Sequence, residues 1–253
     1  MKSFLLMVSF MTRIPVKTNF TFSDDDFRKG IWYIPVIGLL MGLLLYTIYF
    51  LLNPLVSPLV LSLILAVSYI LVTGGIHLDG LADTTDGLGS NQSRDRMLAI
   101  MKDSNIGTFG LLALVIWLAG TIIILSEIPW VCLVMPLAGR TMSLFTCATN
   151  SYARESGMGK TIVNGTRLTH FLFSMFLCIL VVGLFLLFQN SIIKTTSILI
   201  SVAVTFFFAW AAGTFISNKL NGITGDVIGY MIESSSLLFI FITYISFILL
   251  ELL

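Results

Sequence analysis

Three aspartates, Asp79, Asp83 and Asp86, are the densest group of side chains in this chain that could carry chemistry. On a helix they occupy positions i, i+4 and i+7, within an arc of about 60° and roughly 10 Å of axis. Like charges at this spacing repel one another, so the stripe requires a cation. Hard carboxylate oxygens suit Mg²⁺, which takes one or two protein carboxylates together with substrate phosphates. The three aspartates therefore predict a magnesium site for phosphoryl transfer.

The helix face opposite the three aspartates is apolar, and the segment that carries them directly continues one long enough to span a membrane. A solvated acidic loop with one helix-capping aspartate is the alternative that the acidic residues alone leave open. Apolar residues between and beside the aspartates favour a half-buried helix instead: Leu78, Leu81, Ala82 and Leu88. Gly80 and Gly87 weaken a helix, and they also let the backbone approach a ligand closely.

Downstream of the aspartates, residues 93–108 are basic and polar. Leu98 and Met101 predict a short amphipathic helix in the membrane interface. Basic side chains there could clamp phosphate oxygens, arginine in bidentate fashion, and the start of the following span offers free backbone N–H groups. Sorting of positive charge to the cytoplasmic side explains the same basic residues without any substrate. The candidate substrate-binding residues of this segment are Arg94, Arg96, Lys102, Asp103 and Thr108.

Arg140 lies about ten residues inside an apolar segment long enough to span a membrane. A charged side chain at that depth is costly, so we expect Arg140 to face an interior polar site and to take part in catalysis. The alternative is that its long side chain snorkels to the membrane surface.

Most of the chain around these residues is apolar. Of its 253 residues, 57% are hydrophobic and only 11% are charged, with a mean hydropathy of +0.99. Soluble domains carry about a quarter charged residues, so lipid must solvate most of this chain. We therefore expect an all-α, polytopic membrane helix bundle that forms a single domain, residues 1–253. About seven segments reach the roughly 20 apolar residues of a spanning helix: 34–52, 56–74, 108–126, 129–148, 170–188, 195–216 and 235–252.

The long polar segments between these spans all fall on one face, because an even number of crossings separates each from the next. They are residues 1–33, 75–107, 149–169 and 217–234, with Phe4–Met11 as an interfacial or re-entrant stretch. Except for Lys194 and Arg140, all 14 basic residues lie in them: Lys2, Arg13, Lys17, Arg28, Lys29, Arg94, Arg96, Lys102, Arg154, Lys160, Arg167 and Lys219. This bias predicts a multi-pass protein of a bacterial or archaeal cytoplasmic membrane, with its active site at the cytoplasmic face.

Several stretches, in order over nearly the whole chain, resemble the adenosylcobinamide-GDP ribazoletransferase (cobalamin synthase) family. The run from Gly74 to Gly87 and the segment from Lys102 to Thr108 are the most specific of them. The others are Thr12–Val16, Pro35–Gly38, Asp95–Leu98, Ile100–Gly107, Tyr152–Glu155 and Thr224–Asp226. The matching stretches add four candidate substrate-binding residues: His77, Arg154, Thr224 and Asp226.

The resemblance implies a magnesium-dependent transferase. Its substrates would be adenosylcobinamide-GDP and α-ribazole or α-ribazole 5′-phosphate, and its products adenosylcobalamin or its 5′-phosphate and GMP. This reaction completes the lower nucleotide loop of vitamin B12. The lipid bilayer is the expected surrounding, a homo-oligomer or other enzymes of the pathway are possible partners, and nucleic acid is not one.

Two other classes are weighed against this one. A CDP-alcohol phosphotransferase-like enzyme would act on another nucleotide-activated substrate, but it requires an Asp-Gly-x-x-Ala-Arg element with two further aspartates. Here Asp79-Gly80 is followed by Leu81-Ala82-Asp83, with no arginine after the alanine. A transporter would place carboxylates near the membrane midplane, whereas the acidic residues here gather at one surface. The membrane phosphotransferase is the better interpretation.

Overall fold

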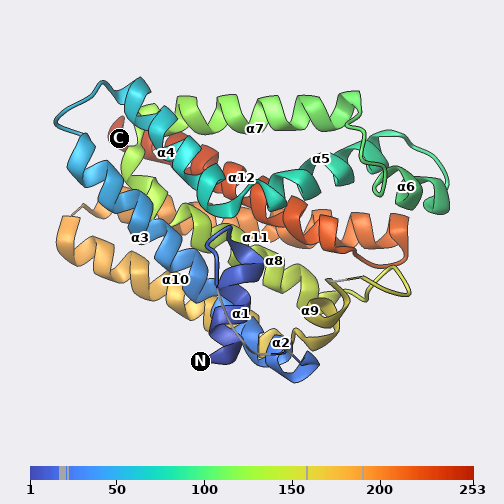
Figure 1. The fold of residues 1–253 in the computed structure, drawn as a ribbon. Coiled ribbons are helices and arrows are strands. Elements are labelled where there is room, and N and C mark those ends of the chain that lie inside the picture. Colours follow the sequence, from blue (N-terminus) through green and yellow to red (C-terminus); the bar gives the residue numbers. More distant parts are fainter. Residues whose placement is uncertain (17–20, 22, 158, 190) are drawn as a thin grey trace.

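The computed structural model describes residues 1–16, 21, 23–157, 159–189 and 191–253, so Lys17 lies outside the described part. Apart from one isolated β-bridge, the regular structure of the described residues is helical (Figure 1). The helices are α1 (Lys2–Met11), α2 (Asp24–Gly30), η1 (Ile31–Tyr33), α3 (Ile34–Leu52), α4 (Pro58–Thr73), α5 (Ile76–Gly89), α6 (Arg94–Ile100), α7 (Thr108–Glu127), η2 (Pro129–Leu133), α8 (Met135–Thr149), α9 (Gly159–Gly165), α10 (Leu168–Gln189), α11 (Ile192–Leu220) and α12 (Gly225–Glu251).

The predicted membrane helix bundle is confirmed, but the count of seven spans is not. Among the described residues, 5 helices are long and apolar enough to cross a membrane, or 6 if α4 and α5 form one bent span. The predicted fourth span, 129–148, forms η2 and the 15-residue α8 instead. Nearly every side chain of α8 is buried against other helices, including α3, α10, α11 and α12. Since protein rather than lipid surrounds it, α8 tolerates polar residues.

Helix α12 begins ten residues before the predicted span, at Gly225 rather than at residue 235. The Thr224 hydroxyl caps it by accepting a hydrogen bond from the backbone N–H of Val227 at 3.3 Å. Its first turns pack against α5 and α8, so these more polar residues are helical without facing lipid.

A sharp break between α4 and α5 sets the direction of the aspartate helix. The two helices meet at 90°, and the linking Gly74 and Gly75 both have left-handed backbones, with φ of 64° and 72°. Residues with a Cβ avoid this region. After the break, α5 lies between α7 and α12 (Figure 1).

Gly80 allows α5 to approach α12 closely. A Cβ at this position would lie 2.5 Å from the backbone oxygen of Asp226 and 3.1 Å from its Cα. Only a glycine fits without a backbone shift, so Gly80 fixes the spacing between the aspartate stripe and the start of α12.

We expect Gly80→Ala to lower the stability of the protein by about 1–3 kcal/mol, because the added methyl overpacks a backbone contact. Thermal unfolding in detergent measures this change. Gly183→Ala is the matched control, since a Cβ on Gly183 meets nothing within 4 Å. Equal melting temperatures for the two variants would contradict a tight contact between α5 and α12.

Candidate active site

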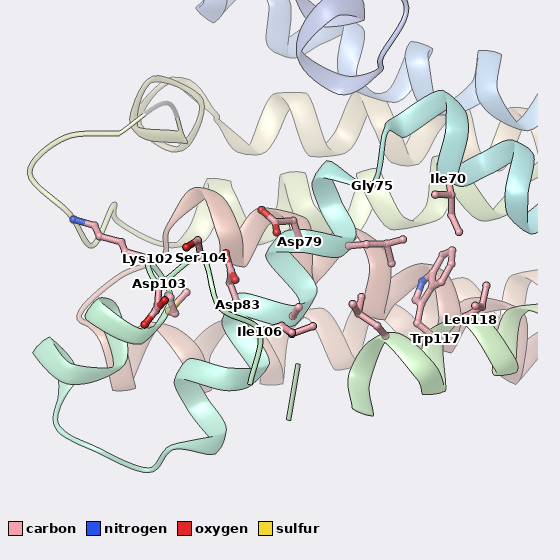
Figure 2. A pocket seen from close by; sticks show the side chains of 14 residues that line it. Ile70, Gly75, Asp79, Asp83, Lys102, Asp103, Ser104, Ile106, Trp117 and Leu118 are labelled. Carbon is pink, nitrogen blue, oxygen red and sulfur yellow. The ribbon is translucent and has the colours of Figure 1, made fainter. Parts of the chain in front are cut away.

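A cavity of about 610 Å³ opens along α5. The carboxylates of Asp79 and Asp83 line one side, and the loop after α6 lines the other (Figure 2). The deeper wall is apolar. Residues Lys102, Asp103, Ser104 and Ile106 come from the loop, and Ile70, Leu114, Trp117 and Leu118 form the apolar part. The cavity thus joins two acidic side chains to an apolar surface, as a binding site for a large amphipathic substrate requires.

Asp79 and Asp83 are one helical turn apart, with Asp79 exposed and Asp83 partly buried. The charges that act on Asp83 include those of Asp79, Asp226 and Arg154. Asp83 accepts no hydrogen bond from the described residues, so its oxygens are free for a ligand.

Asp86, predicted as a third metal ligand, has a different use. Its two carboxylate oxygens accept hydrogen bonds from the backbone N–H groups of Gly107 and Gly110, at 2.7 and 2.8 Å. It therefore caps the N-terminus of α7, where a negative charge also suits the helix dipole. A three-aspartate metal site is not assembled: within the described chain no three His, Cys, Asp or Glu side chains group tightly enough to hold an ion.

The two remaining carboxylates still fit Mg²⁺. This ion commonly takes one or two carboxylates and completes its shell with water and substrate phosphates. Asp79 and Asp83 offer that set on the wall of an open cavity.

A second cavity, of about 450 Å³, adjoins the first and shares Gly75 and Asp79 with it. Arg13 lines this cavity and packs over Gly74, where a Cβ would collide with its side chain. The backbone N–H of Arg13 also donates to Val72 at 2.7 Å. Sequence reasoning missed Arg13 as a site residue, although it belongs to one of the stretches that carry the family resemblance.

Arg154 and Asp226 form an ion pair of 3.0 Å beside Asp83. A β-bridge between Tyr152 and Ile223 holds the two segments together. The Nε atom of Arg154 is buried and has no hydrogen-bond partner in the described residues, and neither Arg154 nor Asp226 lines the cavity. The pair therefore lies near Asp83, and the part of Arg154 and Asp226 in substrate binding stays a prediction.

Several other predicted binding residues have structural contacts instead. Arg94 donates to the backbone oxygens of Leu220 and Ala153, at 2.8 and 2.7 Å, and so ties α6 to two neighbouring segments. Thr224 is buried as the cap of α12. Thr108 is exposed at the start of α7 and does not line the cavity.

The loop that bears Lys102 forms the outer rim of the cavity. The Lys102 side chain runs outward, away from Asp79 and Asp83 (Figure 2). Asp103 accepts hydrogen bonds from the backbone and side-chain amides of Asn105, at 3.0 and 2.8 Å, and these hold the pKa of Asp103 below its usual value. Arg96 is exposed and acts electrostatically on Asp103.

Arg140 lies in the bundle interior with 0% of its surface exposed, so the snorkelling alternative is wrong. It donates to the Pro136 carbonyl oxygen at 3.0 Å and to the Met41 sulfur at 3.1 Å. Its charge acts on Glu233 and Tyr69, but Arg140 does not line the cavity. The predicted interior position of Arg140 is confirmed, whereas its part in catalysis stays a prediction.

His77 belongs to the same interior group rather than to the substrate cavity. Its Nδ1 lies 3.7 Å from Oε1 of Glu233, and that oxygen accepts a hydrogen bond from Tyr69 at 2.9 Å. Trp117, which lines the cavity, lies near the same carboxylate, but its buried indole N–H has no hydrogen-bond partner among the described residues. Sequence reasoning missed Glu233, although a lone carboxylate among Met231, Ile232 and other buried residues is a signal for a paired interior charge.

Comparison with known proteins identifies the family of this chain. The model of the cobalamin-5-phosphate synthase family matches residues 3–244. The chain belongs to this family. Relatives named adenosylcobinamide-GDP ribazoletransferase include one from Alkaliphilus oremlandii, 38% identical over 247 residues, covering 97% of this chain and 98% of the relative. Another, from Acetivibrio thermocellus, is 36% identical over 251 residues, with the same two coverages. No solved structure matches the chain.

Asp83 and Asp86 should respond differently to the loss of their charge. We expect Asp86→Asn to lower stability by about 1–3 kcal/mol, because an amide NH₂ would then face a backbone N–H. Asp83→Asn should leave the melting temperature unchanged or raise it, since it relieves repulsion from neighbouring carboxylates. Thermal unfolding in detergent without Mg²⁺ measures both. Identical melting temperatures would contradict the capping role of Asp86.

Proposed function

We propose that this protein is an adenosylcobinamide-GDP ribazoletransferase, which joins α-ribazole or its 5′-phosphate to adenosylcobinamide-GDP and releases GMP. One observation supports this most directly. The Asp79 and Asp83 carboxylates of the family-matched segment line an open cavity that also has an apolar wall. A corrinoid is bulky and amphipathic, whereas the pyrophosphate of its activated form is anionic, and the cavity has a surface for each part.

In the proposed reaction a ribose hydroxyl oxygen of α-ribazole forms a bond to the phosphorus on the corrinoid side of the pyrophosphate. The bond from that phosphorus to the bridging oxygen breaks, GMP leaves with that oxygen, and the hydroxyl proton is lost to the medium. Such transfers depend on positioning and on neutralisation of charge. Arg154 and Arg13 are the side chains placed to supply positive charge, one beside Asp83 and one beside Asp79.

Asp79 and Asp83 would hold Mg²⁺ between themselves and the pyrophosphate. When bound, the ion neutralises the charge that develops on the phosphoryl oxygens. Asp226 keeps the Arg154 guanidinium beside this position through their ion pair. Trp117, Ile70 and Leu118 would contact the apolar part of the corrinoid and exclude water from it.

The buried residues Arg140, Glu233 and His77 support the site from the bundle interior. Glu233 contacts His77, two residues before Asp79, and is faced by Trp117 of the cavity wall. In this proposal Arg140, Glu233 and His77 are positioning residues, which fix α5 and α7 without touching substrate.

The direct test supplies purified protein in detergent with adenosylcobinamide-GDP, α-ribazole and Mg²⁺, and measures GMP and the base-on corrinoid. We expect turnover that requires Mg²⁺, and a loss of about 10²-fold or more in Asp83→Asn, the usual size for removal of a preorganised charge. Asp24→Asn, an exposed aspartate of α2, is the matched control and should keep normal turnover. No GMP from wild-type protein, or full turnover in Asp83→Asn, would contradict the proposal.

In the proposed orientation the cavity opens on the cytoplasmic side of the membrane. In a background without Cys132, Cys147 and Cys178, we expect single cysteines at Asn91 and Glu155 to resist an impermeant thiol reagent in intact cells. Both should react after lysis. A cysteine at Leu55, in the exposed α3–α4 turn, should react from outside. Labelling of Asn91→Cys in intact cells would reverse the orientation.

A further inference from the structure

A basic cavity lies apart from the substrate site, at the start of helices α3 and α10. Its volume is about 470 Å³, and it shares no lining residue with the cavity at Asp79. Three cations line it, together with polar and aromatic side chains: Arg28, Lys29, Arg167, Asn164, Trp32 and His170. Neither the proposed reaction nor the predicted site residues account for this cavity.

Two of the three cations have no acidic partner within the described residues. Lys29 pairs with Asp25 at 2.6 Å, but neither Arg28 nor Arg167 forms an ion pair. Both guanidinium groups are exposed on the same cavity wall. Their joint charge favours an anion, and the planar forks of two arginines suit a phosphate group.

The aromatic wall of the cavity is rigid. The rings of Trp32 and His170 lie 4.4 Å apart, and Trp32 also contacts Phe173 at 5.4 Å. The Nδ1 atom of His170 accepts a hydrogen bond from the backbone N–H of Arg167 at 2.9 Å. In the neutral ring the proton therefore sits on Nε2, which is a further donor. Tryptophan at the end of a spanning helix is typical of the membrane–water interface.

A second, apolar cavity lies farther along the same pair of helices. It has a volume of about 320 Å³, and its lining includes Leu39 and Leu43 of α3, and Leu184 and Phe185 of α10. Helices α3 and α10 both start at the basic cavity and run in the same direction (Figure 1). At 1.5 Å per residue, Leu43 lies about 16 Å along the helix from Trp32. That distance is about the depth of one leaflet, half of roughly 30 Å.

We infer that the seam between α3 and α10 binds an anionic glycerophospholipid, with the headgroup phosphate at Arg28 and Arg167 and an acyl chain in the apolar cavity. A free phosphate or nucleotide would use the basic cavity alone and leave the apolar one unexplained. A zwitterionic lipid would bring a second cation close to two arginines. An anionic lipid would place its phosphate in the basic cavity and would reach the apolar cavity with an acyl chain.

The test measures lipid retention by native mass spectrometry of the full chain in a neutral detergent. Phosphatidylglycerol, phosphatidylcholine and soluble glycerol 3-phosphate are titrated separately, and glycerol 3-phosphate is also added as a competitor. We expect wild-type protein to retain phosphatidylglycerol in preference to phosphatidylcholine, and glycerol 3-phosphate not to displace it.

Two variants address the two cavities. Arg167→Gln should weaken phosphatidylglycerol binding about fivefold, with Lys219→Gln, an equal loss of charge elsewhere, as its control. Leu184→Trp should fill the apolar cavity and weaken binding about tenfold. Its control is Leu187→Trp, at a position that is 76% exposed and outside that cavity. If Arg167→Gln fails to fold, Arg28→Gln replaces it.

Four results would overturn the inference. Displacement by glycerol 3-phosphate, or wild-type binding in Leu184→Trp, would make the basic cavity a site for soluble anions. Equal weakening by Arg167→Gln and Lys219→Gln would mean that lipid binding depends only on overall charge. Equal retention of phosphatidylcholine would mean that the seam does not select anionic lipid.

Discussion

The hydrogen bond from Tyr69 to Glu233 joins α4 to α12 in the interior of the bundle. Glu233 has no exposed surface, so its carboxylate must be compensated by protein groups. Arg140 of α8 acts on it with the opposite charge without forming a direct ion pair in the described structure, and Trp117 of α7 and His77 of α5 lie near the same carboxylate. Five helices thus meet at one acidic side chain. A displacement of α4 or α8 would take this hydrogen bond or this positive charge away from a buried acid, which is more costly than the loss of an apolar contact.

This interior group also determines where the aspartates of the site lie. His77 is buried 3.7 Å from Glu233 at the beginning of α5, and Asp86 caps α7 near the other end of α5. Between these two anchors, Asp79 and Asp83 face the cavity. Gly80, on a neighbouring face of the helix, keeps α5 against α12. The site is therefore carried by a short helix that is fixed at both ends.

The bounds of the helices that face lipid could be predicted accurately from the sequence, because a long apolar run is itself the signal for such a helix. The predicted span 34–52 coincides with α3, and 108–126 differs from α7 by one residue. Where protein replaces lipid as the surroundings, the signal fails: α8 and the first turns of α12 are buried but polar. Within the site, Asp79 and Asp83 were identified from spacing. The use of Asp86 was not, because its partners are backbone N–H groups that no side-chain pattern records.

The order of synthesis gives the Tyr69–Glu233 contact a further consequence. The two residues are 164 positions apart, and Arg140 is made before Glu233. Chains emerge from the ribosome N-terminus first, so α8 enters the membrane before its counter-ion exists. The nascent protein must keep Arg140 hydrated or transiently paired until α12 arrives. Insertion of α12 is thus the step that brings an opposite charge to Arg140. A chain truncated before α12 would keep Arg140 in the bilayer without Glu233.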